Sequence, residues 1–166
     1  MANISHLMLG GNVGNRLGYL RLCIDFLHRD IGRVVTVSSV YESEPWGFND
    51  PCWFLNQVAV VETSLAPLTL LEYTQRIEYT LGRLRLHNDY HARTMDIDIL
   101  LYGNQIINMR GLVIPHPRMA ERMFVLQPMA ELAPDLAHPV LRCTMKCLRE
   151  KCTDRKQVKV YEENHE

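Results

Sequence analysis

The chain has 166 residues, a net charge of −1 and 47% hydrophobic residues. This length suits one domain with a buried core, and the near-zero charge argues against a binder of nucleic acid or membrane surfaces, which usually carries a basic excess. The N-terminus lacks a basic segment, and no apolar run is long enough to cross a bilayer, so we expect no signal peptide, no membrane contact and a cytoplasmic protein.

In the first part of the chain, hydrophobic residues follow the two-residue spacing of strands in some stretches and the spacing of a helix in another. Three stretches are β-branched or alternate as strands do, and one carries apolar residues at helical spacing. They predict strands at 3–9, 33–41 and 54–63 and a helix at 16–30. A glycine-rich turn at 10–15 precedes that helix, and prolines and glycine make 42–53 a loop.

The second part continues the alternation and ends in a charged tail. Its patterns predict helices at 67–82 and 124–132, strands at 94–102 and 157–161, a hairpin partner at 105–108 and a short helix ending near 151. Prolines on both sides of His116 predict an extended segment at 114–117. The order predicts an α+β fold: a ferredoxin-like βαββαβ sandwich with helices on one face of a mainly antiparallel sheet. We expect one domain over 1–166, in which about 141–166 is a C-terminal extension without an assigned role.

The strand at 94–102 contains two carboxylates, Asp96 and Asp98, two residues apart. Successive side chains of a strand point to opposite faces, so both aspartates share one face and Ile97 and Ile99 the other. About 6.5–7 Å separates residues two apart, which allows both carboxylates to bind one metal ion or a pair. Taken alone, the pattern equally fits two aspartates on the wet face of an edge strand, paired with arginine.

Three arginines favour the metal site. Arg83 and Arg85 follow the helix end, and Arg93 precedes the aspartates. Guanidinium groups near metal-binding carboxylates are suited to hold a polyphosphate. The alternative is a solvated loop whose arginines pair with nearby acids.

Other candidates are weaker when taken singly. His116 is held by stiff backbone and is able to donate to a phosphate, although a loop histidine is more often structural. Phe54 and Phe124 offer faces for a flat ligand and Asn56 an amide for its edge, although phenylalanine is usually a core residue. The turn at 10–15 lacks the GK[S/T] ending of a P-loop. The five cysteines lack CxxC spacing, which favours reduced thiols over a metal site.

In this order the motifs resemble the 6-hydroxymethyl-7,8-dihydropterin pyrophosphokinase family of folate biosynthesis, over nearly the whole chain to about residue 140. The resemblance depends on Leu-Gly-Gly-Asn-Val-Gly-Asn-Arg at 9–16, Ser-Val-Tyr-Glu-Ser-Glu-Pro at 39–45, Phe-Leu-Asn at 54–56, Gln-Arg-Ile-Glu at 75–78, Gly-Arg-Leu-Arg at 82–85, Arg-Thr-Met-Asp-Ile-Asp-Ile-Leu at 93–100, Ile-Pro-His-Pro at 114–117, Phe-Val-Leu-Gln-Pro at 124–128 and Ala-Pro-Asp at 133–135.

The resemblance implies transfer of pyrophosphate from ATP to the hydroxymethyl oxygen of the pterin, with release of AMP. It implies that Asp96 and Asp98 hold two Mg²⁺ ions and that Arg83, Arg85 and Arg93 are catalytic. The implied ATP-site residues are Gln75, Glu78, Arg93, Ile99, His116 and Arg122. The implied pterin-site residues are Ser43, Pro45, Trp46, Phe54, Asn56 and Phe124. We expect a monomer whose partners are these two substrates.

The chain departs from the family pattern before the catalytic arginine. Asp89-Tyr90-His91-Ala92 stands where many members have Arg-Trp-Gly-Pro, and Pro117 replaces a common tyrosine. We expect activity with altered loop closure and ATP affinity. The alternatives are an idle relative that only binds the pterin, and an RNA-binding domain of the same element order. The low charge and the absence of a paired-aromatic strand motif argue against RNA binding.

Overall fold

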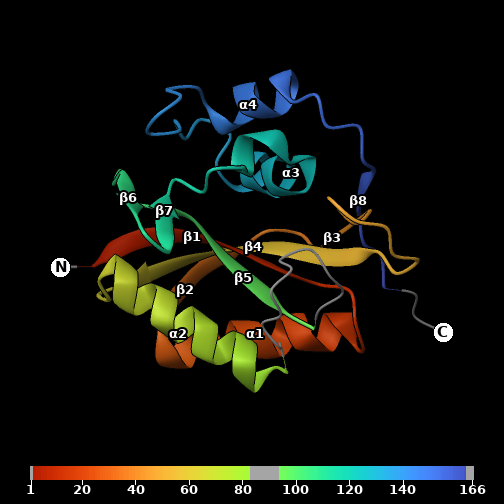
Figure 1. Ribbon diagram of the computed structural model, residues 1–166, viewed down its shortest axis with the longest axis horizontal. Helices are drawn as coiled ribbons and strands as arrows, with labels where there is room; N and C mark the ends of the chain where they lie inside the picture. Colours follow the sequence, from red (N-terminus) through yellow and green to blue (C-terminus); the bar gives the residue numbers. More distant parts are fainter. Residues whose placement is uncertain (1, 83–93, 164–166) are drawn as a thin grey trace.

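The computed structural model describes residues 2–82 and 94–163. Strands and helices alternate along this part of the chain, as Figure 1 shows. The strands are β1 (Asn3–Gly11), β2 (Gly32–Val37), β3 (Tyr41–Ser43), β4 (Phe54–Thr63), β5 (Asp96–Tyr102), β6 (Ile107–Met109), β7 (Leu112–Ile114) and β8 (Val158–Val160). The helices are α1 (Arg16–Asp30), α2 (Pro67–Thr80), the 3-10 turn η1 (Met119–Glu121), α3 (Met123–Leu132) and α4 (Met145–Lys151).

The main sheet has the strand order β5-β1-β4-β3-β8, and β2 pairs with β4 beside β3. All its pairings are antiparallel. Helices α1 and α2 follow β1 and β4 in sequence and return the chain to the sheet, which confirms the ferredoxin-like βαββαβ arrangement. The strands β6 and β7 form a separate hairpin.

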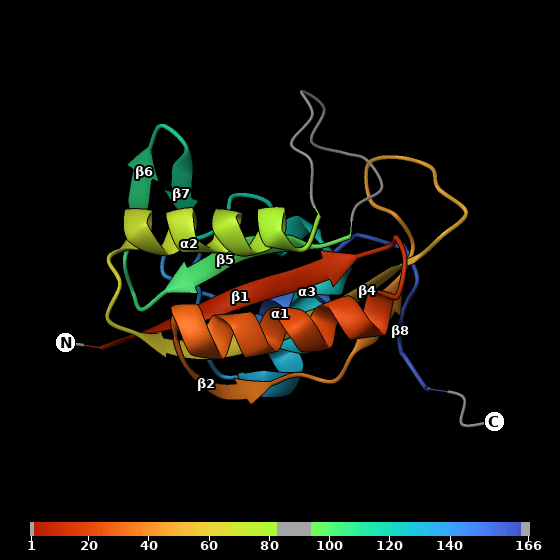
Figure 2. The same ribbon diagram turned by 90° about the horizontal axis from the view of Figure 1, so that it is seen from below.

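Helices cover both faces of the sheet rather than the one face expected. Figure 1 shows α3 and α4 on one side of the sheet and α1 and α2 on the other, and Figure 2 shows α1 and α2 side by side. Alternate residues of β1 serve the two layers: Leu7 and Leu9 pack with the α1 and α2 core, and Met8 with α3 and α4. A strand that is buried on both faces has a continuous apolar sequence, so the sequence does not indicate that a second helical layer, α3 and α4, covers the other face.

The strand expected over 33–41 is interrupted. Ser38 takes over pairing with β4 through its side chain, whose Oγ accepts a hydrogen bond from Val58 N at 3.0 Å. Its carbonyl oxygen accepts from Gln57 Nε2 at 2.8 Å. Ser38 N also donates to Val58 O at 2.9 Å, so the side-chain bonds supplement the backbone pairing at the point where β2 ends at Val37, and β3 begins only at Tyr41.

The segment after β5 also differs from the expectation. The sequence predicts a hairpin strand at 105–108, whereas the structure has β6, which begins only at Ile107 and pairs with β7. Ile114, expected in the extended segment, ends β7 and is buried. Within the described residues, no helix has the length and apolarity needed to span a membrane.

Gly32 fixes the close approach of β2 to β4. A Cβ atom there would lie 2.1 Å from the backbone oxygen of Glu62, so the two strands would have to move apart. We expect Gly32→Ala to lower the free energy of unfolding by about 2 kcal/mol, as overpacking usually does. Urea denaturation measures this. Val35→Ala, at an exposed position of the same strand, is the control and should cost less than about 1 kcal/mol. Equal midpoints for the two variants would contradict the packing argument.

Candidate active site

A pocket lies on the α3 face of the sheet and has about 500 Å³ of empty space, part of it open to solvent. The strands β1, β3, β4 and β5, the 44–53 loop and the start of α3 supply its walls. Its lining residues are Met8, Gly10, Ser43, Glu44, Trp46, Phe48, Phe54, Asn56, Asp96, Asp98, Arg122 and Phe124.

Asp96 and Asp98 stand in this pocket as the strand alternation predicts. Both are half-buried, whereas Ile97 and Ile99 are buried in the core against α1 and α2. Asp96 pairs with Gly10 of β1, and Asp98 with Met8. The aspartates therefore face the pocket, and the isoleucines fasten their strand to the core.

The antiparallel register places Asp96, Gly10 and Asn56 in one row across β5, β1 and β4. Neighbouring strands are about 4.8 Å apart, so the backbones of Asp96 and Asn56 are separated by roughly 10 Å. Glycine is needed between them, because a Cβ on Gly10 would lie 2.6 Å from Asn56 Oδ1. The row thus has a carboxylate at one end, an amide at the other and open backbone between.

Asn56 is held in a fixed orientation. Its Nδ2 donates a hydrogen bond to Ser43 Oγ at 2.5 Å, and both residues are buried. This bond leaves the carbonyl oxygen of the amide on the Gly10 side, as the short distance to a Cβ on Gly10 indicates. A buried, oriented amide is suited to read the polar edge of a heterocycle.

Aromatic rings and one arginine complete the lining of the pocket. Phe48 and Phe54 meet edge to face, with ring centroids 5.9 Å apart. The Arg122 guanidinium lies 4.6 Å from the ring centroid of Trp46 and 5.7 Å from that of Phe124. This arrangement combines flat apolar surfaces with a positive charge.

His116 lies close to this charge cluster but lines a neighbouring hollow. Its backbone N donates to Leu100 O at 2.9 Å, which ties the Pro-His-Pro segment to β5. Burial, helped by the charges of Arg122 and Arg118 and opposed by that of Asp96, lowers the pKa of His116 to about 4. The imidazole is therefore neutral near pH 7.

Other residues predicted from the sequence lie elsewhere. Pro45 lines a second hollow, formed by the 44–53 loop and Lys156, and Gln75 lines another on α2. Glu78 and Ile99 are buried, at 2% and 5% exposure. The predicted catalytic residues Arg83, Arg85 and Arg93 lie outside the described residues, as do Asp89 and Tyr90.

Sequence reasoning missed four lining residues: Met8, Gly10, Glu44 and Phe48. The sequence places Gly10 in a turn, whereas β1 extends to Gly11, so the meaning of a glycine inside a strand, a close approach of other groups, appears only in the structure. Phe48 and Glu44 belong to a loop whose sequence has no periodic hydrophobic pattern, so their spacing does not indicate which way they face.

The donor set fits magnesium bound together with a substrate. No group of three or more His, Cys, Asp or Glu side chains that could hold a metal ion occurs in residues 2–82 and 94–163. Mg²⁺ commonly takes only one or two carboxylates and completes its octahedron with water and substrate phosphate. Asp96 and Asp98 on one pocket wall meet that requirement.

Comparison with known proteins gives one consistent family. Residues 6–134 match the model of the 7,8-dihydro-6-hydroxymethylpterin-pyrophosphokinase (HPPK) family. The 2-amino-4-hydroxy-6-hydroxymethyldihydropteridine pyrophosphokinase of Bacillus subtilis is 47% identical over 133 residues, 80% of this chain and 79% of that protein. The enzyme of the same name from Porphyromonas gingivalis is 42% identical over 139 residues, 82% of this chain and 94% of its own length.

The fold comparison agrees. The HPPK-DHPS protein of Plasmodium falciparum, in a crystal structure with STZ-DHP, superposes with a TM-score of 0.77 at 19% identity. That match covers 91% of this chain and 43% of the larger protein. At this identity the likeness concerns the fold alone. The family match and the two enzyme relatives show that the chain belongs to the 7,8-dihydro-6-hydroxymethylpterin-pyrophosphokinase family.

Proposed function

We propose that the chain transfers pyrophosphate from ATP to the hydroxymethyl group of 6-hydroxymethyl-7,8-dihydropterin, giving AMP and the pterin pyrophosphate, in folate biosynthesis. Membership of the family and the names of its relatives support this reaction. The observation that carries it is the row Asp96–Gly10–Asn56, which, with Asp98 two residues along β5, brings two carboxylates and an oriented amide into one pocket.

The pterin would lie between Phe54 and Phe124, with its polar edge toward Asn56. Flat heterocycles stack well on aromatic faces, and the amide offers both a donor and an acceptor group. Ser43, Pro45 and Trp46 would bound the same end of the ring system. In this pose the hydroxymethyl group points along the row toward Asp96, because the amide fixes the opposite edge.

Asp96 and Asp98 would hold two Mg²⁺ ions. When bound there, magnesium supplies neutralisation of the phosphate charge and favours loss of the proton from the accepting hydroxyl. The two carboxylates fit this role, since each is half-exposed toward the pocket while its strand is anchored by buried neighbours. Arg122 adds a positive charge on the opposite wall for the transferred phosphates.

His116 would donate to a phosphate of ATP. Its Nδ1 accepts a hydrogen bond from Arg118 N at 3.2 Å, which leaves the proton of the neutral ring on Nε2. A neutral donor keeps this role across the physiological range because its pKa is about 4. Gln75, Glu78, Arg93 and Ile99 would complete the ATP site, and Arg83 and Arg85 would belong to a loop that closes over both substrates and excludes water.

We expect a monomeric enzyme in the cytoplasm that acts as one domain. The five cysteines are free thiols in the structure, as suits a reducing compartment. The direct test of the activity is AMP formation from ATP, measured with and without 6-hydroxymethyl-7,8-dihydropterin and Mg²⁺. AMP formation that does not require the pterin, or its absence with all three components, would refute the proposal.

Removal of either pocket carboxylate should stop turnover without unfolding the protein. We expect Asp96→Ala and Asp98→Ala each to lower kcat by about a thousandfold, the effect of losing several kcal/mol of charge stabilisation in the transition state. AMP release measures this, and Asp25→Ala, at an exposed position of α1, is the control with unchanged kcat. Normal AMP release by a folded Asp96 or Asp98 variant would rule out the metal assignment.

A side chain at Gly10 should weaken pterin binding selectively. The Cβ atom of Gly10→Ala would push on Asn56 Oδ1 from 2.6 Å and turn the amide away from its bond with Ser43. We expect the KM for the pterin to rise about tenfold, as the loss of one or two hydrogen bonds predicts, while the KM for ATP stays within about twofold. Equal changes in both KM values would show that Gly10 does not serve the pterin subsite.

His116 should make stability depend on pH below neutrality. Its folded-state pKa of about 4 lies below the ordinary 6.5, so the unfolded chain binds a proton that the folded chain excludes. Stability should therefore fall as the pH is lowered from 6.5 toward 4. His116→Asn removes this contribution, so its free energy of unfolding should change less between pH 7 and pH 4.5. Urea denaturation at both pH values measures this. An equal change in the free energy of unfolding between the two pH values for wild type and variant would contradict the expectation.

A further inference from the structure

The C-terminal segment 154–160 lies beyond the residues that match the family model, which end at 134. It crosses beside both the 44–53 loop and the start of α3, the two segments that supply Glu44, Trp46, Arg122 and Phe124 to the pocket. Among the described residues that line the pocket, none comes from 154–160. The segment therefore affects the pocket only through the walls that it contacts.

The first contact is a strand pairing that extends to the pocket rim. β8 pairs with β3 in the register Tyr41–Val160, Glu42–Lys159 and Ser43–Val158. Ser43, which holds the Asn56 amide, is thus enclosed between β4 and β8. Without β8, the three-residue strand β3 would be an edge with open backbone groups.

The pairing continues one residue further, onto a residue that lines the pocket. Glu44 N donates to Gln157 O at 3.2 Å, and Gln157 N donates to Glu44 Oε2 at 2.7 Å. This reciprocal pair fixes both the backbone and the side chain of Glu44. A charged acceptor makes the second bond the stronger of the two.

The second contact is at the start of α3. Asp154 Oδ2 accepts a hydrogen bond from Met123 N at 3.0 Å. Residue Arg122, at the N-cap position, makes no side-chain cap to this helix, so Asp154 supplies a cap from 31 residues away. The capped residue stands between Arg122 and Phe124, which line the pocket.

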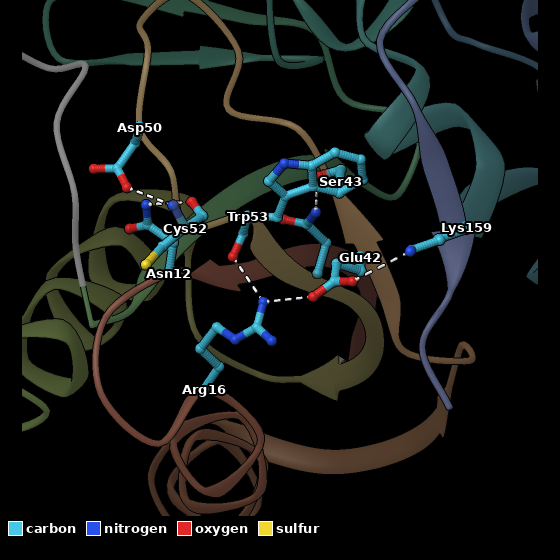
Figure 3. A network of polar contacts seen from close by, with 9 residues as sticks. Asn12, Arg16, Glu42, Ser43, Asp50, Cys52, Trp53 and Lys159 are labelled. Atoms are coloured by element: carbon cyan, nitrogen blue, oxygen red, sulfur yellow. Dashed lines mark hydrogen bonds and ion pairs between the residues drawn. The ribbon is translucent and has the colours of Figure 1, made fainter. Parts of the chain in front are cut away.

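The third contact is a charged network, drawn in Figure 3. Arg16 Nη1 donates to Glu42 Oε2 at 2.7 Å and to Trp53 O at 2.8 Å, while Lys159 Nζ lies 3.7 Å from Glu42 Oε1. The Lys159 ammonium also lies 5.4 Å from the centroid of the Trp53 ring. The far end of the 44–53 loop is therefore tied to the same segment as its beginning.

We propose that residues 154–160 form a brace that positions the pterin subsite, with the Gln157 backbone and the Asp154 carboxylate as its positioning groups. The brace holds Glu44 and the start of α3 at a fixed separation, and these are the two walls between which the ring system would enter. This inference rests on the proposed function, because it assigns the braced walls to the pterin rather than to ATP.

The test uses a pair of variants at one position. Gln157→Pro removes the N–H that donates to Glu44, whereas Gln157→Ala keeps that N–H and removes only the side chain. In the full chain, we expect Gln157→Pro to raise the KM for 6-hydroxymethyl-7,8-dihydropterin about tenfold, the effect of one or two lost hydrogen bonds. The KM for ATP should stay within about twofold, and Gln157→Ala should match wild type.

A second pair keeps the proposal testable if proline prevents folding. Asp154→Ala should raise the KM for the pterin about threefold to tenfold. Asp154→Asn retains an acceptor oxygen for Met123 N, so its KM for the pterin should stay close to the wild-type value. Equal pterin KM values in Gln157→Pro and Gln157→Ala, or equal rises in the two substrate KM values, would overturn the brace. Failure of the proposed function is a separate result, because wild type would then form no AMP.

Discussion

The register between β1 and its two neighbours is the constraint on which the site depends. Pairing Gly10 with both Asp96 and Asn56 brings together two polar groups that lie 40 residues apart in the chain. A slip of one residue would turn each side chain to the opposite face and bury the carboxylates against α1 and α2. The apolar residues of the same strands prevent such a slip, because the core holds Leu9 and Ile97 on the other face.

The site is thus built by one sheet with two different faces. The α1 and α2 face closes a continuous apolar core, which fixes the strands. The opposite face is apolar under α3 and α4 but becomes polar at the C-terminal end of β1 and the start of β5, where the pocket lies. Catalytic groups on strands of a packed sheet have less freedom than groups on loops, and this rigidity is what metal-bridged phosphoryl chemistry requires.

The sequence predicts the elements that depend on local pattern. The alternation around Asp96 and Asp98 identifies their shared face, and the element order identifies the ferredoxin-like sandwich. The sequence pattern does not predict contacts between residues that are distant in the chain. The break at Ser38 depends on bonds to β4, and the second helical layer depends on burial of both sheet faces. Phe48 lines the pocket from a loop whose sequence has no periodic pattern. The motif resemblance supplied the candidate pterin-site residues that spacing alone left open.

The same reasoning explains why the tail carries no recognisable motif. Its bonds to Glu44 and to β3 use backbone groups, which any residue except proline can provide, so its pairing leaves little trace in residue identity. Asp154 and Lys159 are exceptions, because the Asp154 side chain supplies the cap that Arg122 does not, and the Lys159 ammonium lies near Glu42. A segment that acts mainly through its backbone is identified from its strand pairing in the structure and not from its residue types. The boundary of a family's sequence pattern need not coincide with the boundary of the structure that shapes its site.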